Sequence, residues 1–268
     1  MNRKTILAFL AGASLAFFGF LVGSGTGQPA MNRNDQSVMA VLWYQRSAEA
    51  QALYHQAFNV ARMRIDEDLA GNTTPRKRAV VVDIDETVLN NSPHSAKLIR
   101  DNQVFPYAWN DWVNRAEAEP LPGAVEFLNY AVSKGYDVYY VSNRSAATEL
   151  AGTMKNLIAR GFPQVTKDHI LLKEKESSKE VRRKSIEATH RIVVLMGDNL
   201  NDLSSVFERK SVSERSAEVE KLKNEFGNRF IVLPNPMYGD WESALYGYRR
   251  GLTDAQKDSA RIASLQAF

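Results

Sequence analysis

Five nearly unbroken apolar runs occur along the chain, and each is short enough for a β-strand. They cover 79–84, 136–142, 169–172, 191–196 and 229–233, of which 169–172 is the weakest. Between them, apolar residues recur at helical spacing over 122–134, 145–160, 177–189 and, in pieces, 201–226. Strands that are almost wholly apolar and alternate with helices indicate a parallel sheet covered on both faces. The pattern therefore predicts a doubly wound, Rossmann-like α/β fold, in which ligands bind at the carboxyl ends of the strands.

Three further segments lie outside this alternation. Residues 37–69 carry apolar positions at mixed spacings of three and four without glycine or proline, which predicts one or two long helices. We expect a smaller helical subdomain, and its segments are 37–72, 93–118 and 241–268. We expect it to lie beside a core made of about 77–92 and 119–240. Together these parts form one predicted domain over 31–268.

The first 30 residues differ in kind from the rest. Arg3 and Lys4 precede an apolar run at 6–23, and small residues follow it. A basic start followed by an apolar stretch is typical of an export signal. The run is slightly longer than usual, so it could also stay uncleaved as a membrane anchor. We therefore expect a protein that is periplasmic, secreted or anchored to a membrane outside the cytoplasm.

Composition narrows the chemistry that the chain can perform. The 268 residues carry a net charge of +3 and include no cysteine. Without the two basic residues of the leader the charge is about +1, which gives no indication of binding to a nucleic-acid polymer. The lack of cysteine excludes a thiol nucleophile, a cysteine metal ligand, disulfides and the acylated cysteine of a lipoprotein.

Carboxylates and a hydroxyl follow three of the predicted strands. The first strand runs into "DIDET", with Asp83 and Asp85; the second ends in "VSNR", with Ser142; the third is followed by "GDNLND", with Asp198 and Asp202. The carboxyl ends of parallel strands share one edge of the sheet, so we expect these side chains to meet. Clustered carboxylates repel one another unless a cation neutralises them. Oxygen ligands without a Cys or His cluster favour a hard ion, most plausibly Mg²⁺.

A lysine completes this set. In "KEKESSKEVRR", Ser177 and Glu180 have the spacing of a capping box that starts a helix. Lys179 then lies in the first turn, where the helix dipole disfavours a cation by about 0.3–1 kcal/mol and a nearby anion would be welcome. Lys173, at a strand end, is the alternative, and we favour Lys179. A cation site, a hydroxyl, a lysine and two carboxylates together are suited to phosphoryl transfer.

Each part of the set has a structural alternative when it stands alone. Ser142 could be a helix N-cap, and Asp198 and Asp202 could cap the helix that follows them. Two aspartates after an apolar run are a weak signal. Three such clusters, each at a strand end and in this order, favour a catalytic site over coincidence.

The order of the motifs resembles the haloacid dehalogenase (HAD) superfamily of phosphohydrolases. "DIDET" is similar to its nucleophile motif, "VSN" to its hydroxyl motif and "GDNLND" to its last acidic motif. More narrowly, the chain resembles the class C bacterial acid phosphatases, a family that includes 5′-nucleotidases. The stretches that carry this likeness include "SAEAQALYHQAFNVAR", "LNNSPHSA", "AWNDWV", "PLPGAVEFLNYA", "SSKEVRR" and "LPNPMYGDWESAL". The resemblance spans roughly 37–268 and implies a HAD-type fold and an exported phosphomonoesterase.

The resemblance also implies catalytic roles. Asp83 attacks phosphorus to form an aspartyl-phosphate, and Asp85 protonates the leaving oxygen and then activates water. One Mg²⁺ is bound by the carboxylates of Asp83 and Asp198 and by the main-chain carbonyl of Asp85. Asp202 either belongs to the surroundings of the metal or orients Lys179. Glu86 receives no role.

For substrate binding, the resemblance implies a phosphate site and a stacking site. The residues expected to hold the phosphoryl oxygens are Ser142, Asn143 and Lys179. Trp109 and Tyr238 are expected to sandwich the base of a nucleoside 5′-monophosphate, and such stacking contributes about 1–3 kcal/mol per base. Trp112 and Trp241 are the alternatives that fit the hydrophobic core better.

Other functions fit parts of the pattern. A phosphotransferase could pass the aspartyl-phosphate to an alcohol at the same site. A phospho-accepting signalling receiver would fit the acidic edge, but an export signal would separate it from cytoplasmic kinases. A surface binding protein with a decayed site is a further alternative, against which the retained Asp83, Asp85, Lys179 and Asp198 argue. We expect a small phosphomonoester as partner, attachment to a membrane only through the N-terminal apolar segment, and a chain that is compatible with a homodimer.

Overall fold

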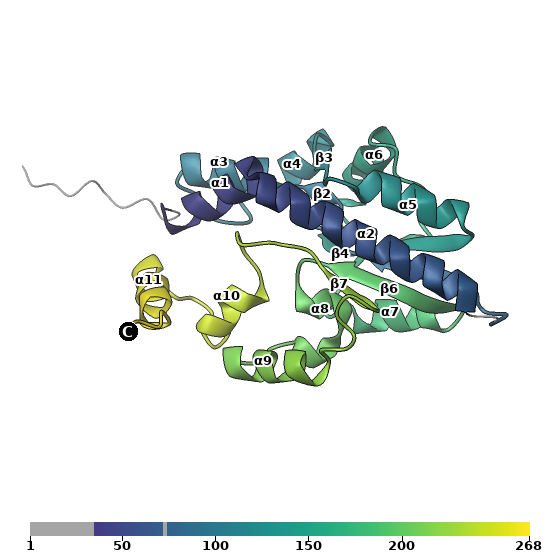
Figure 1. Ribbon diagram of the computed structural model, residues 1–268. Coiled ribbons are helices and arrows are strands. Elements are labelled where there is room, and N and C mark those ends of the chain that lie inside the picture. The colour runs from purple at the N-terminus through teal and green to yellow at the C-terminus, as the bar shows by residue number, and fades with distance from the viewer. Residues whose placement is uncertain (1–34, 72–73) are drawn as a thin grey trace, which may run out of the picture. The chain divides into compact units, whose positions relative to one another are not determined.

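A five-stranded parallel sheet lies at the centre of residues 35–71 and 74–268, the part of the chain that this computed structural model describes (Figure 1). Its strands are β1 (Lys77–Val82), β4 (Tyr136–Ser145), β5 (Ile170–Lys173), β6 (His190–Gly197) and β7 (Phe230–Val232). They are ordered β5-β4-β1-β6-β7, and every neighbouring pair is parallel. The predicted strands are confirmed, and so is the doubly wound α/β fold.

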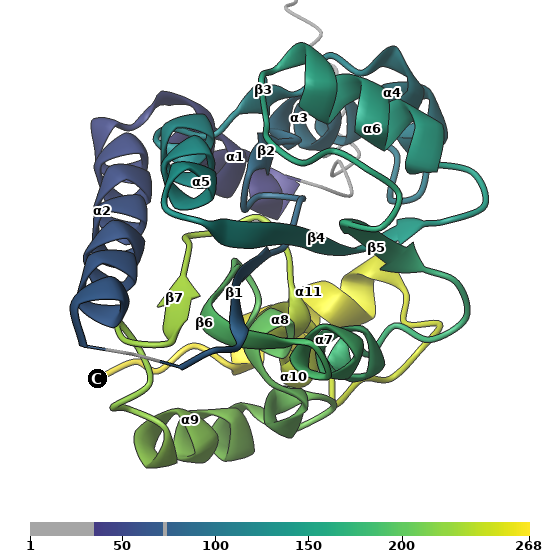
Figure 2. The same ribbon diagram turned by 90° about the vertical axis from the view of Figure 1, so that its right-hand side faces the viewer.

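Helices cover both faces of this sheet. On one face α2 (Ala48–Gly71) and α5 (Ala124–Ser133) lie side by side, and on the other face lie α7 (Glu180–Glu187) and α8 (Leu200–Leu203) (Figure 2). Strand β1 contributes side chains to the cores on both faces of the sheet, because successive side chains of a strand point to opposite faces. Val80 and Val82 belong to the core under α2 and α5, whereas Ala79 and Val81 pack with Ile186 of α7.

The remaining elements surround this layered core. They are η1 (Asp35–Ser37), α1 (Val38–Arg46), β2 (Leu89–Asn90), α3 (Ser92–Arg100), α4 (Trp109–Arg115), β3 (Glu119–Pro120), α6 (Leu150–Ala159), η2 (Ser205–Phe207), α9 (Val212–Lys221), α10 (Asp240–Leu245) and α11 (Asp254–Ala263). Strands β2 and β3 form a small antiparallel pair, α1 packs on α3, and α4 packs on α6. Hydrogen bonds of Asn91, the residue before α3, with Asp85 and with Trp112 of α4 place these two helices next to the chain that leaves β1.

The position of helix α2 differs from the one predicted, because the sequence pattern had assigned this helix to a helical subdomain beside the sheet. Its buried side chains Tyr54, Phe58 and Ile65 belong to the same core cluster as Val80 and Val82 of β1. The physical reason is that α5 leaves part of the sheet's apolar face open, and the apolar side of α2 covers it. Helix α2 is therefore a layer of the core.

The predicted export segment at 1–30 lies outside the described residues. The described residues belong to a unit that extends from Asn32 to Phe268. Within 35–71 and 74–268, every helix is too short or too polar to cross a membrane.

Candidate active site

Three aspartates meet at the carboxyl edge of the sheet, as the motif order predicts. Asp83 follows β1 directly, Asp198 follows β6, and Asp202 belongs to α8. One carboxylate oxygen of each lies within 4.8 Å of the others. The amide of Asp83 donates to Met196 O of β6 at 3.0 Å, so the sheet's hydrogen bonding continues to this residue. A rigid strand thus holds the carboxylate in place.

Lys179 supplies the positive charge at this cluster. Its ammonium nitrogen lies 2.5 Å from Asp83 Oδ1 and 2.6 Å from Asp202 Oδ1; Lys179 and Asp83 are buried, and Asp202 is partly buried. Lys179 is therefore the lysine that contacts the aspartates, in agreement with the preference for it over Lys173. The predicted capping box of Ser177 is wrong, because Lys179 itself takes the N-cap position of α7.

Burial and charge shift the protonation of this cluster. Burial raises the pKa of Asp83 from 3.8 to about 7, Lys179 opposes the shift, and Asp202 and Asp85 add to it. Burial likewise raises the pKa of Asp198, with further contributions from Asp202 and Asp83. Burial alone would lower the pKa of Lys179, but Asp202 and Asp83 outweigh it and raise that pKa. Carboxylates in this situation gain from a further cation, so the donor set fits a divalent metal ion.

Two residues that the sequence analysis did not assign hold Asp198. The hydroxyl of Thr87 donates to Asp198 Oδ1 at 3.1 Å and accepts from the Asp198 amide at 3.1 Å. Asn235 Nδ2 donates to Asp198 Oδ2 at 2.8 Å. Thr87 belongs to "DIDET", and Asn235 belongs to "LPNPMYGDW", so the motifs contained both residues without indicating their partner.

Asp202 has two structural partners besides Lys179. It accepts from the amide of Asn199 at 3.0 Å and so completes the capping box that starts α8. It also packs directly on Gly197, where a Cβ atom would lie 2.4 Å from Asp202 Cβ. Only glycine permits this approach, so the first residue of "GDNLND" is required for steric reasons.

Asp85 belongs to a second group of polar residues at the same edge. Its Oδ1 accepts from Arg144 at 2.8 and 2.9 Å and from Asn91 Nδ2 at 2.8 Å, and its Oδ2 accepts from Ser142 Oγ at 3.3 Å. The sequence analysis assigned Ser142 but neither Arg144 nor Asn91. Arg144 follows the predicted residues Ser142 and Asn143 in "VSNR", and this adjacency was the sequence signal that could have placed it in the site.

Asn143 lies apart from this group. Its side chain is exposed and its Oδ1 accepts from Arg182 Nη2 at 2.7 Å. Neighbouring residues of a strand point to opposite sides, so Asn143 turns away from the side to which Ser142 points. The structure therefore does not bring the predicted phosphate-binding Asn143 to the aspartates.

Glu86 is completely buried beside the site. Its carboxylate accepts from the Asn91 amide at 2.7 Å and from the hydroxyl of Tyr238. The pKa of Glu86 is raised from 4.5 to about 8, mainly by burial and also by Asp85, while Tyr238 and Asn91 oppose the shift. Glu86 thus links Tyr238 to the loop that carries the catalytic candidates.

The aromatic candidates lie around the same edge. The Arg144 guanidinium carbon lies 5.5 Å from the ring centre of Trp109, the first residue of α4. Tyr238 is 40 % exposed while its hydroxyl reaches Glu86. Of the two tryptophans expected in the core, Trp112 packs against the core cluster while its Nε1 donates to Asn91 Oδ1 at 2.8 Å, whereas Trp241 is 45 % exposed.

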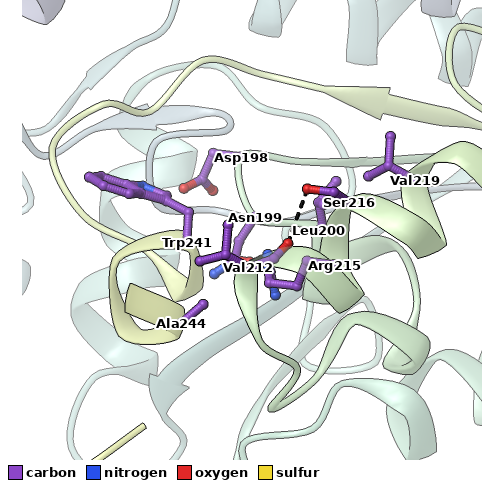
Figure 3. A pocket seen from close by; sticks show the side chains of 9 residues that line it. All are labelled: Asp198, Asn199, Leu200, Val212, Arg215, Ser216, Val219, Trp241 and Ala244. Atoms are coloured by element: carbon purple, nitrogen blue, oxygen red, sulfur yellow. Dashed lines mark hydrogen bonds between the residues drawn. The ribbon is translucent and has the colours of Figure 1, made fainter. Parts of the chain in front are cut away.

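A pocket of about 270 Å³ opens beside Asp198 (Figure 3). Figure 3 shows the indole of Trp241 near Asp198, with side chains of α9, among them Val212 and Arg215, forming another wall. The pocket also borders Asn199. Asp198 is thus reachable for a small ligand or an ion.

The family of this chain follows from comparison with known proteins. Residues 28–241 match the family described as HAD superfamily, subfamily IIIB (acid phosphatase). The chain belongs to this family. The class C acid phosphatase from Bacillus anthracis is 48 % identical, with a TM-score of 0.86, over 89 % of this chain and 100 % of that chain. The structure of that enzyme with tungstate bound gives a TM-score of 0.85 with the same identity and coverage. The likeness to the class C acid phosphatases is thereby confirmed.

More distant relatives occur among the curated proteins. The stem 31 kDa glycoprotein of Glycine max is 29 % identical over 162 residues, which are 58 % of this chain and 57 % of that protein. The stem 28 kDa glycoprotein of the same plant is 27 % identical over 172 residues, which are 60 % of each protein. The matched residues thus span less than two thirds of these curated relatives.

Proposed function

We propose that this protein is an exported, Mg²⁺-dependent acid phosphatase that hydrolyses small phosphomonoesters through an aspartyl-phosphate. The observation that carries the proposal is the buried Asp83 carboxylate, held 2.5 Å from the Lys179 ammonium and next to Asp198 and Asp202. This arrangement combines a nucleophile, a cation for the phosphoryl oxygens and carboxylates for a metal. Membership in an acid phosphatase family supports the same chemistry.

The reaction consists of two displacements at phosphorus. In the first, an oxygen of Asp83 attacks phosphorus, the bond to the leaving oxygen breaks, and that oxygen takes a proton from Asp85. In the second, water gives a proton to Asp85 and attacks phosphorus, and the bond to Asp83 breaks. The products are the alcohol and inorganic phosphate. Each proton that Asp85 donates is restored by water, so the enzyme returns to its starting state.

Lys179 and Ser142 are the proposed phosphate-binding residues. Lys179 already contacts Asp83, so its ammonium can neutralise a phosphoryl oxygen as that carboxylate attacks. Ser142 Oγ lies 3.3 Å from Asp85 Oδ2 and so borders the path of the leaving oxygen. The contact of Lys179 with Asp202 favours the role of Asp202 in orienting the lysine.

The residues present fit a divalent metal ion. Asp83 and Asp198, with the main-chain carbonyl of Asp85, are the proposed ligands, and the raised pKa values of the two buried carboxyl groups are the observation that favours a cation there. When bound, the ion would neutralise charge on the phosphoryl oxygens. Oxygen ligands alone favour Mg²⁺ over softer metals.

The proposed substrates are nucleoside 5′-monophosphates and other small phosphomonoesters. Trp109 and Tyr238 both lie at the edge of the sheet that carries the aspartates, through Arg144 and Glu86 respectively. An exposed aromatic face suits stacking on a base. Export rests on the basic and apolar pattern of the first 30 residues, and this segment is the proposed means of any attachment to a membrane. The chain is compatible with a homodimer.

The decisive experiment replaces the nucleophile. Asp83→Asn should abolish turnover of p-nitrophenyl phosphate and AMP while the circular dichroism spectrum is unchanged, and EDTA should abolish wild-type turnover until Mg²⁺ is restored. Asp101→Asn, on the exposed Lys97–Asp101 ion pair, is the matched control. Substantial turnover by Asp83→Asn would refute the nucleophile, and turnover that resists EDTA would refute the metal dependence.

A further inference from the structure

Arg144 is a buried cation to which the proposed mechanism gives no role. Its side chain is only 1 % exposed, and its Nε and Nη2 donate to the same oxygen, Asp85 Oδ1, at 2.9 and 2.8 Å. Its Nη1 donates to Thr153 Oγ1 at 3.0 Å. A guanidinium is costly to bury unless its charge and its donors are paired. Asp85 Oδ1 accepts from two of these donors, and it can do so whether or not Oδ2 carries a proton, so the two residues are fixed with respect to each other.

A second set of donors holds the same oxygen from another direction. Asn91 Nδ2 donates to Asp85 Oδ1 at 2.8 Å. The orientation of the Asn91 amide is fixed in turn, because its Oδ1 accepts from Trp112 Nε1 at 2.8 Å and an indole N–H can only donate. The ring of Trp109 lies over the Arg144 guanidinium, with 5.5 Å between its centre and Cζ. Residues from β4, α4 and the loop before α3 therefore converge on one oxygen of Asp85.

The two oxygens of Asp85 are consequently different. Oδ1 accepts three hydrogen bonds from Arg144 and Asn91 within the described ranges. Among residues 35–71 and 74–268, the one donor to Oδ2 is Ser142 Oγ, at the longer distance of 3.3 Å. A proton on Oδ1 would point at N–H donors and would cost hydrogen bonds to a charged group. Oδ2 is the oxygen with room for a proton.

We infer that Arg144 is a positioning residue that locks Oδ1 of Asp85, so that Oδ2 alone exchanges protons with the leaving group and with water. This inference rests on the proposed function. When the ester bond breaks, its electron pair stays on the leaving oxygen, which takes the proton from Oδ2. Asp85 is then an anion, and the guanidinium that faces it stabilises that charge. Water later returns a proton to Oδ2 as its oxygen bonds to phosphorus.

The inference predicts a dependence on the leaving group. p-Nitrophenolate leaves readily without a proton, whereas an alkoxide requires one, and positioned acid catalysis contributes about 10²- to 10⁴-fold. Arg144→Met should therefore lower kcat/KM for glycerol 3-phosphate at least about 100-fold but lower kcat/KM for p-nitrophenyl phosphate less than about tenfold, because kcat/KM reports the first displacement, in which the leaving group departs. Arg144→Lys, which keeps the charge but not the paired donors, should fall between wild type and Arg144→Met.

A matched control and a second variant keep the test decisive. Arg160→Met removes a guanidinium that binds the carbonyls of Ala118 and Glu117 away from the aspartates, and it should leave the ratio of the two kcat/KM values unchanged. Trp112→Phe keeps an aromatic ring, although a smaller one, and removes the N–H that orients Asn91, so it should shift the ratio in the same direction by a smaller factor. If Arg144→Met does not fold, as judged by circular dichroism, the activity ratios of Trp112→Phe and Arg144→Lys test the inference in its place.

The outcomes separate this inference from the proposed function. A wild-type enzyme that hydrolyses both substrates, with variants that lose both activities in equal proportion, would overturn the positioning role alone. A large rise in KM at constant kcat would also overturn it, because it would make Arg144 a binding residue. A wild-type protein that hydrolyses neither substrate would overturn the proposed function itself.

Discussion

The ammonium of Lys179 contacts two aspartates, at 2.5 Å from Asp83 Oδ1 and 2.6 Å from Asp202 Oδ1. Three elements bring these residues together, because Asp83 directly follows β1, Lys179 precedes α7 and Asp202 lies in α8. Asp202 packs on Gly197 and also contacts the lysine. The charge of Lys179 is thus aimed at Asp83 before any substrate arrives.

Replacing this lysine should disable the site more than it disturbs the fold. Lys179→Met removes the charge that opposes the raised pKa of Asp83, so that pKa should rise above about 7 and the carboxylate should become scarcer at acidic pH. We expect kcat for p-nitrophenyl phosphate to fall about 10²- to 10³-fold, the usual cost of one electrostatic donor in a catalytic site. Lys173→Met, at the end of β5, should stay within twofold of wild type. Similar losses in both variants would contradict the assignment of Lys179.

Glu86 should give the metal-free protein a characteristic pH dependence of stability. The folded protein holds the Glu86 proton up to pH about 8, whereas the unfolded chain releases it above its ordinary pKa of 4.5. The folded state then binds more protons between these values, so the free energy of unfolding should fall as the pH rises from about 4.5 to about 8, by at most about 1.4 kcal/mol per pH unit.

Urea unfolding of wild type and Glu86→Gln in EDTA at several pH values checks this expectation. The amide has no proton to lose, so the variant should show the shallower decline. Equal slopes for the two proteins would mean that Glu86 is ionised in the fold.

The aromatic pair should determine preference among substrates. Trp109→Ala should raise KM for AMP about tenfold, in line with about 1–3 kcal/mol for stacking on a base, and should change KM for glycerol 3-phosphate little. Trp241→Ala removes an exposed indole from the pocket beside Asp198, so it shows whether that pocket, and not the Trp109 ring, determines the preference for AMP. If Trp109→Ala weakens both substrates alike, its ring packs against Arg144 and does not contact the base.

Asp68 of α2 should matter for stability and not for catalysis. It accepts from Arg78 Nε at 2.9 Å, from the Tyr136 hydroxyl at 2.7 Å and from Arg191, and so ties α2 to three strands. Burial raises its pKa, but Arg191, Tyr136 and Arg78 outweigh burial and lower it. Its contribution is therefore present above the ordinary pKa of 3.8 and is lost as the pH falls through the lowered value.

Thermal unfolding and urea titration at neutral pH test this role. Asp68→Asn should reduce the free energy of unfolding by about 1–3 kcal/mol with unchanged kcat. Glu67→Gln on the same helix, in an exposed pair with Arg64, should change it by less than about 1 kcal/mol. If Asp68→Asn left the free energy of unfolding unchanged, α2 would be held by its apolar face alone.

Much of the fold was predictable because buried segments are apolar, and this pattern can be read from neighbouring residues in the sequence. The run at 79–84 is apolar because β1 is covered on both faces, and the carboxylates begin where that cover ends. The acidic cluster was predictable for a related reason, since a parallel sheet brings the carboxyl ends of its strands to one edge. The family resemblance added roles to Asp83, Asp85 and Asp198, and the structure brings Asp83 and Asp198 to one cluster with Asp85 beside them.

Prediction and structure differ where the outcome depends on tertiary contacts that leave no pattern in the local sequence. Asn143 stands in the hydroxyl motif, but strand alternation turns its side chain to Arg182. The spacing of Ser177 and Glu180 imitates a capping box, although the chain places Lys179 at the N-cap so that it reaches the aspartates. Helix α2 carries the same periodicity whether it covers a sheet or a neighbouring helix, so its position had no local signal.

The sequence by itself determined the order of strands and helices, the edge where the ligand site forms, and the residue types collected there, because hydrophobic periodicity and strand termini are local properties of a chain. The tertiary structure decided which oxygen meets which donor. Thr87 holds Asp198 across 111 residues, and Trp112 orients Asn91 across 21. Such pairings arise from packing between elements distant in sequence, and it is this packing that makes the two oxygens of Asp85 different.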